Sequence, residues 1–169
     1  MDTQILACLT REMTAYYAGD PARIQHFMKV YAFSRTIALL ENCDDALRFV
    51  LEAAALVHDI GIKPSEAKYG SCAGPYQELE GPPVAREMMQ KLGFDPDVID
   101  RVCWLVGHHH TYNPIDGMDH QILVEADFLV NLFEGAEKKE AILSAYHRIF
   151  KTEAGKTLCR QMFGLTEEE

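Results

Sequence analysis

The segment LVHDIGIK, residues 56–63, ends an apolar run with a His-Asp pair and gives the strongest indication of the fold. An imidazole and a carboxylate on adjacent residues cannot usually both face a hydrophobic core. Ligand-type residues recur in three other segments, at His26, at the histidine triplet 108–110 and at Asp127. This ordered series indicates a metal site that is assembled from several helices of a bundle.

A chain of 169 residues fits one domain, and its hydrophobic content of 48% is enough for a single well-packed core. A formal net charge of −10 disfavours binding to nucleic-acid polymers and anionic membranes, so a phosphorylated substrate would have to be captured locally. Five cysteines without a Cys-x-x-Cys pair indicate reduced thiols. The first residues show no basic region followed by a long apolar run, and no stretch reaches the ~20 apolar residues of a membrane span. We therefore expect a soluble, cytoplasmic protein.

Helix-start and helix-stop signals predict helices in the first part of the chain. Asp20 and Pro21 are a cap-and-proline start, and the helix that follows carries His26 on its buried stripe. Asp44 or Asp45 can cap the next helix, which has the His-Asp pair at its carboxyl end and Gly61 placed to end it.

The rest of the chain is predicted to contain one long loop and further helices. Residues 64–83 are rich in Gly, Ser and Pro without a sustained period, which indicates a loop that serves as a lid, binds a ligand or is simply mobile. Helical patterns resume at residues 84–93, at a cap-and-proline start at 95–96 and at 119–134, and residues 137–163 indicate two shorter helices. No strand pattern is found, so the fold is expected to be all-α.

Metal binding is the favoured explanation of the inward polar residues. One histidine on an apolar stripe is usually a core residue that hydrogen-bonds to the backbone. An inward aspartate is rarer, because an ionised carboxylate has a large desolvation cost unless it is paired or binds a cation. A buried ion-pair network would need cations on the same stripes, where only Arg23 and Lys63 are well placed.

These motifs resemble the HD-domain superfamily of metal-dependent phosphohydrolases. Arg-x-x-His, Ala-Ala-Leu-Val-His-Asp-Ile-Gly, a His-rich helix end and Glu-Ala-Asp-Phe-Leu-Val occur in the family's order between about residues 23 and 132. The resemblance implies an HD-domain helical bundle that forms a single domain over residues 1–169. Its core would span about 20–134, with flanking helices at 2–18 and 137–163.

The resemblance also implies the ligands of a first metal ion, namely His26, His58, Asp59 and Asp127. Their mixed nitrogen and oxygen donors suit Mn, Fe, Ni, Zn or Co better than calcium, and Mg is an alternative.

The sequence departs from the family pattern in two places. Family members often read His-Asp-x-Gly-Lys, but Ile62 intervenes before Lys63 here, which puts the match to the family lysine in doubt. Members with two metals usually carry another histidine before the later ones, and residues 60–107 contain none. Glu78 or Glu80 could replace it as a ligand or general base, or either could be an exposed acid before a helix.

The histidine triplet is expected to bind a second metal ion or a substrate phosphate. The buried stripe points His109 inward, with His110 beside it and His108 more to the side. Tyr112, Asn113 and Arg23 are candidate substrate-binding residues, whereas His120 and His147 are expected at the surface.

The expected reaction is hydrolysis of a phosphomonoester or phosphodiester, in a nucleotide or small phosphorylated metabolite. Asp59 would orient water or take its proton, and Lys63 or an inward histidine would offset charge on the phosphate oxygens. Two alternatives are a two-iron HD-type oxygenase and a non-catalytic HD module that senses a nucleotide or metal. The chain is expected to be a monomer or homodimer.

Overall fold

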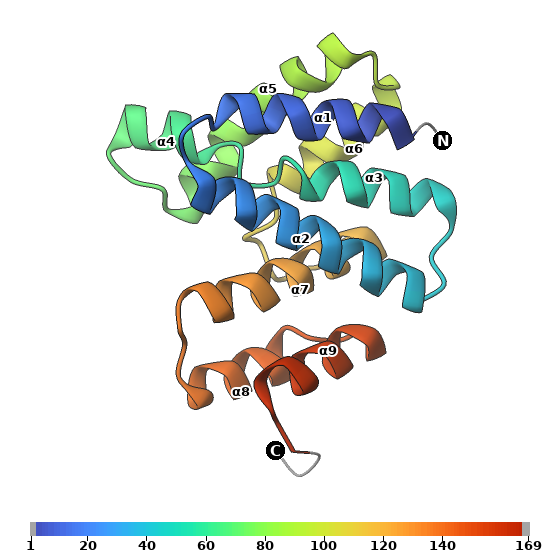
Figure 1. Ribbon diagram of the computed structural model, residues 1–169, viewed down its shortest axis with the longest axis vertical. Coiled ribbons are helices and arrows are strands. Elements are labelled where there is room, and N and C mark those ends of the chain that lie inside the picture. The colour runs from blue at the N-terminus through green and yellow to red at the C-terminus, as the bar shows by residue number, and fades with distance from the viewer. Residues whose placement is uncertain (1–2, 167–169) are drawn as a thin grey trace.

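A computed structural model describes residues 3–166, and this part of the chain folds into nine helices without a strand (Figure 1). The prediction of an all-α fold is therefore confirmed. None of the helices in the described range is both long and apolar enough to span a membrane. The helices are α1 (Thr3–Tyr16), α2 (Pro21–Leu40), α3 (Asp45–Ala55), α4 (Ile62–Tyr69), α5 (Gly74–Leu92), α6 (Pro96–Val106), α7 (Gly117–Glu134), α8 (Lys139–Arg148) and α9 (Glu153–Phe163).

Three predicted helix starts are confirmed by their caps. The carboxylate of Asp20 accepts a hydrogen bond from the backbone N–H of Arg23, and Pro21 begins α2. Asp44 caps α3 in the same way, and Asp95 caps α6. Each cap satisfies a backbone donor that the first helical turn leaves unpaired, which usually contributes about 1 kcal/mol.

The prediction of one long loop over residues 64–83 is wrong, because helices α4 and α5 occupy most of this segment. Gly70 ends α4 in the left-handed conformation, and Pro75 lies in the first turn of α5. The two helices are separated only by residues 70–73. Pro82 and Pro83 lie inside α5, where prolines normally break a helix, and they hide its periodicity in the sequence.

The sequence suggested that Gly61 ends the helix that carries the His-Asp pair, but the structure does not place it there. Helix α3 already ends at Ala55, and Gly61 has right-handed backbone angles directly before α4. Its role is close packing, since a Cβ atom at this position would lie 2.5 Å from the carbonyl oxygen of Gln77 and 2.7 Å from the amide nitrogen of Gly81. The turn that carries the His-Asp pair is thus fixed against the backbone of α5.

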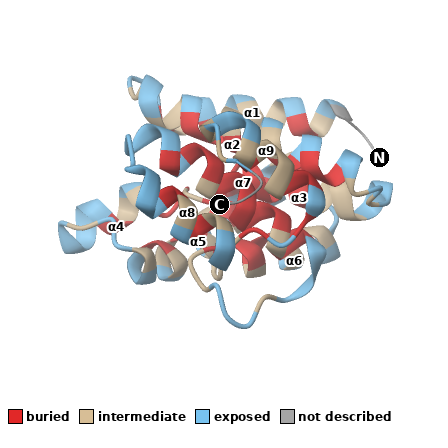
Figure 2. Cartoon of the chain, turned by 90° about the horizontal axis from the view of Figure 1, so that it is seen from below, coloured by how far each residue is buried: buried red, intermediate tan, exposed pale blue. Residues whose placement is uncertain are grey.

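Helix α2 packs against both α3 and α7, and α5 packs against α6 (Figure 1). Buried residues gather where they meet, while α4 and the outer faces are exposed (Figure 2). Fully burying one large apolar side chain contributes roughly 1.5–3 kcal/mol. Examples in the core are Phe27, Ile37, Leu51, Leu56, Ile60, Leu105 and Leu123.

The last two helices are attached to α7 through a buried carboxylate. Glu125 accepts hydrogen bonds from the backbone N–H groups of Lys151 (2.6 Å) and Thr152 (2.9 Å) and from the side chain of Gln121 (2.7 Å). Gly155 lies against the same carboxylate, where any Cβ atom would collide with it. This contact holds α8 and α9 next to α7 and fixes the space between α7 and α8.

Candidate metal centre

The histidines and carboxylates of the predicted site come together at the centre of the bundle. His26 lies on α2, His58 and Asp59 lie in the turn after α3, and Asp127 lies on α7. His58 has no exposed surface, while 14% of the Asp59 side chain is exposed. Asp59 therefore faces the opening of the cluster.

The distances between the two histidine nitrogens and the two carboxylate oxygens suit one metal ion, and His26, His58 and Asp59 form one group of candidate ligands. The Nε2 atom of His26 lies 3.2 Å from Oδ1 of Asp127 and 3.5 Å from Oδ2 of Asp59. The Nε2 atom of His58 lies 3.5 Å and 3.7 Å from the same two oxygens. Ligands that are bound at the usual metal distances lie about 3.0–3.6 Å apart in tetrahedral or octahedral geometry.

Hydrogen bonds to the outer ring nitrogens leave the inner nitrogens as acceptors. The Nδ1–H groups of His26, His58 and His109 find acceptors at 2.8–2.9 Å, on the Glu134 carboxylate and on the carbonyl oxygens of Ala55 and Val106 respectively. In the neutral form of each ring, the Nε2 atom then presents a lone pair toward the carboxylates of Asp59 and Asp127. Lone pairs and negative charges that face one another need a cation between them. This donor set fits a transition metal, whose histidine ligands are usually oriented by such outer acceptors.

A second group of ligand atoms is formed by Asp59, His109 and His110. Nε2 of His109 lies 3.1 Å from Oδ1 of Asp59, so the two oxygens of this carboxylate face different groups. Nε2 of His110 is buried and has no hydrogen-bond partner, although buried polar atoms are nearly always satisfied. An ion or a phosphate oxygen in the second group would give this atom its missing partner.

In the metal-free site, burial and the neighbouring charges shift the pKa values of the histidines and of Asp59. Burial lowers the pKa of His26, but its hydrogen bond to Asp127 and the charge of Asp59 raise it further, to about 9. Burial raises the pKa of Asp59, but the charges of His58 and His109 bring it down to about 2. For His110, burial and the charge of His109 lower the pKa to about 4. A metal ion must therefore displace a proton from His26 but none from His110 at neutral pH.

Three residues that sequence reasoning missed position the ligands. Glu134 holds His26 and is itself paired with Lys29, and the side-chain amide of Asn131 donates to Oδ1 of Asp127 at 2.8 Å. Asp127, Asn131 and Glu134 are spaced i, i+4 and i+7, which places them on one face of a helix. This spacing could have identified the two outer residues from the inward aspartate alone.

Some predicted site residues lie outside the cluster. The Nζ atom of Lys63 donates to the carbonyl oxygen of Tyr16 (2.8 Å) and lies over its ring, so it does not reach the cluster. Glu80 is held by Lys68 and Tyr69. Glu78 accepts a hydrogen bond from the backbone N–H of His110 (3.0 Å) and braces the histidine turn.

Among the other histidines, His120 stabilises the loop that follows the triplet. The prediction that His120 lies at the surface is wrong, because it is fully buried. Its Nε2–H donates to the carbonyl oxygen of His108 (2.9 Å), and its Nδ1 accepts from the N–H of Asp116 (3.1 Å). It satisfies backbone groups of the loop, which sequence periodicity does not reveal. His108 bonds to the carbonyl oxygen of Trp104, whereas His147 is exposed as expected.

A cleft of about 450 Å³ opens onto His26 and Asp59. Arg23 and Lys29 line it, and both are paired with carboxylates, Arg23 with Glu66 at 2.7 Å. Tyr112 is 40% exposed and lies next to the second group, 3.3 Å from Nδ1 of His110, and Asn113 is exposed beside it. The cleft gives a solute access to the cluster.

Comparison with known proteins agrees with this arrangement. The HD domain family model matches residues 23–152, and the chain belongs to this family. A similar solved structure is the crystal structure of a predicted HD superfamily hydrolase from an uncultured Thermotogales bacterium, with 28% sequence identity and a TM-score of 0.64. The match covers 98% of this chain and 87% of that one. No curated protein matches the chain significantly.

Proposed function

We propose that this protein is a metal-dependent phosphohydrolase that cleaves a phosphomonoester or phosphodiester in a nucleotide or small phosphorylated metabolite. The observation that supports this best is the position of Asp59. Its two carboxylate oxygens face two groups of histidines, and the same side chain borders the cleft. A substrate phosphate that enters the cleft would meet His26 and also Asp59, which both groups share.

His26, His58, Asp59 and Asp127 would hold the first ion, and His109 and His110 a second ion or a phosphate oxygen. The nitrogen and oxygen donors suit Mn, Fe, Ni, Co or Zn, with Mg as an alternative. When bound, such an ion supplies a Lewis acid that polarises phosphoryl oxygens and lowers the pKa of water toward ~7.

Residues around the cleft would orient the attacking water and bind the substrate phosphate. The low pKa of Asp59 keeps its carboxylate ionised at neutral pH, so it can accept a hydrogen bond from the attacking water and orient it. Arg23 and Lys29 line the cleft and offset part of the negative charge of an incoming phosphate. This local capture matters because the net charge of −10 repels anions at long range. Lys63 has no part in this scheme.

The similar Thermotogales structure is described as a predicted HD superfamily hydrolase, which supports a hydrolase of the same family here. A screen of metal-supplemented protein against nucleotides and phosphorylated metabolites tests the proposal by phosphate release. Asp59→Asn, which keeps the side-chain size, serves as the inactive control. Oxygen consumption by the iron-loaded protein without phosphate release would contradict the proposal in favour of an oxygenase. Nucleotide binding without turnover would indicate a sensing module.

A further inference from the structure

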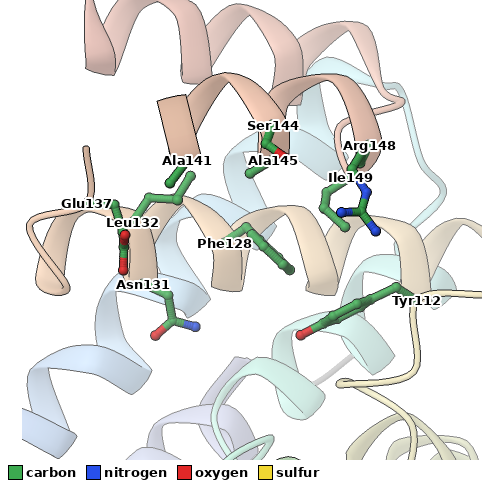
Figure 3. Close-up of a pocket in the computed structure, with 10 residues that line it drawn as sticks. All are labelled: Tyr112, Phe128, Asn131, Leu132, Glu137, Ala141, Ser144, Ala145, Arg148 and Ile149. Carbon is green, nitrogen blue, oxygen red and sulfur yellow. The ribbon is translucent and has the colours of Figure 1, made fainter. Parts of the chain in front are cut away.

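A second cavity, of about 420 Å³, lies between α7 and α8 (Figure 3). Its volume is in the usual range for cavities that bind small molecules. The contact between Glu125 and the start of α9 keeps α8 in place beside it. The cavity is lined by Tyr112, Phe128, Asn131, Leu132, Glu137, Ala141, Ser144, Ala145, Arg148 and Ile149.

The cavity adjoins the candidate metal centre at two points. Asn131 lines both this cavity and the cleft at Asp59, and its amide bonds to Asp127. Tyr112 lines the cavity, and its hydroxyl lies 3.3 Å from the ring of His110. The cavity and the cleft at the metal centre are thus immediate neighbours.

The walls suit a flat organic group. The rings of Tyr112 and Phe128 lie 5.2 Å apart at 71° and form an aromatic corner. Across from them α8 contributes the small side chains of Ala141 and Ala145, which leave an open slot beside the rings. Aromatic side chains interact favourably with another ring through stacked or edge-on packing.

One end of the cavity carries a cation that is available for a ligand. Within residues 3–166, no carboxylate, carbonyl group or ring is paired with the guanidinium of Arg148. Glu137, the acid that lines the same cavity, lies at the opposite end (Figure 3). An arginine without a partner binds carboxylates and similar planar acceptors through two parallel hydrogen bonds.

We propose that this cavity binds the organic group of the substrate, and that this group is a flat ring that carries a carboxylate or a comparable anionic acceptor. Tyr112 and Phe128 contact the ring, and Arg148 binds the acceptor and thereby selects the substrate. This inference rests on the proposed phosphohydrolase function, since it needs a phosphate-binding metal centre beside the cavity.

Binding of phosphonates to the manganese-loaded protein tests the inference by calorimetry without requiring turnover. We expect affinity to increase from methylphosphonate to phenylphosphonate to 4-phosphonobenzoate. Arg148→Ala should weaken 4-phosphonobenzoate about tenfold and leave phenylphosphonate unchanged, because only the former carries the acceptor. Arg11→Ala, at a highly exposed arginine on α1, is the matched control and should change neither affinity.

Phe128→Leu removes one ring and keeps an apolar side chain. It should weaken both aryl phosphonates and leave methylphosphonate unchanged, which also shows that the variant is folded. Equal affinities for the three phosphonates, no binding of any of them, or equal weakening of both aryl compounds by Arg148→Ala would overturn the inference. Phosphate release in the substrate screen tests the proposed phosphohydrolase function independently. A failure of that function can therefore be distinguished from a failure of the inference about the cavity.

Discussion

The candidate metal centre, called the cluster below, and the cavity between α7 and α8 are neighbours built in different ways. In the cluster, His26, His58 and Asp127 are almost fully buried, and each is oriented by an outer partner. In the cavity, Arg148 and Tyr112 are exposed, and Arg148 has no partner in the described part of the chain. The difference indicates that the cluster tolerates few substitutions, because the position of each ligand depends on several helices. The ligand preference of the cavity, in contrast, can change through substitution of single surface residues.

The largest effect is expected from Asp59→Asn. The substitution keeps the side-chain size but removes the charge that both histidine groups face, so phosphate release should fall by at least about 10²-fold. Steady-state phosphate release measures the loss, and circular dichroism checks that the variant is folded. An undiminished rate on the best substrate would show that the proposed mechanism is wrong.

Metal binding should stabilise the folded protein. The cluster draws its ligands from α2, from the turn after α3 and from α7, so an ion that binds only the folded chain links distant segments. At ~100 times the dissociation constant it adds about 2.7 kcal/mol, which raises the melting temperature by several degrees. Thermal melts with Mn, Ni or Co, and elemental analysis of the purified protein, measure this. Absence of both metal and shift would end the metal interpretation.

Affinity for the metal should depend on pH, because His26 must lose a proton to bind. Its pKa in the metal-free protein is raised to about 9, so protons compete with the ion below that pH. Affinity should therefore rise with pH by up to about tenfold per unit between pH 6.5 and 8.5, and level off above about 9. Mn²⁺ titrations followed by electron paramagnetic resonance measure it. A constant affinity over this range contradicts the proton assignment.

The smallest effect is expected from substitutions at two adjacent histidines, His108 and His109. His109→Ala removes a ring that faces Asp59 and should weaken second-ion binding or activity about tenfold. His108 bonds to the carbonyl oxygen of Trp104 instead, so His108→Ala should have a much smaller effect. Titrating both variants side by side with metal distinguishes the two positions. Negligible effects at both would mean that the triplet is only a polar helix end.

The sequence predicted the cluster better than its surroundings, for a physical reason. Helices with a buried stripe are recognisable locally, and His26 and Asp127 lie on such stripes, while His109 lies in the turn that directly follows the stripe of α6. Helix α4 and the part of α5 before residue 84 are not recognisable in this way, because α4 is short and exposed and that part of α5 runs into two prolines.

Two further errors follow from tertiary contacts that no local pattern encodes. Lys63 lies in the first turn of α4, and its side chain packs on Tyr16 of α1 rather than on the cluster. His120 is buried because loop backbone groups need its ring nitrogens. In both cases the partner is remote in sequence or belongs to the backbone, so residue type and periodicity could not predict the contact.

The shared carboxylate of Asp59 has a thermodynamic consequence for any pair of ions held by the two groups. Because one side chain belongs to both, its charge cannot be fully neutralised by each ion independently. Occupancy of one group must change the dissociation constant of the other, and by linkage the factor is the same in both directions. That factor is the ratio of one group's dissociation constants with the other group empty and with it filled, and it measures how strongly a single carboxylate couples the two ions.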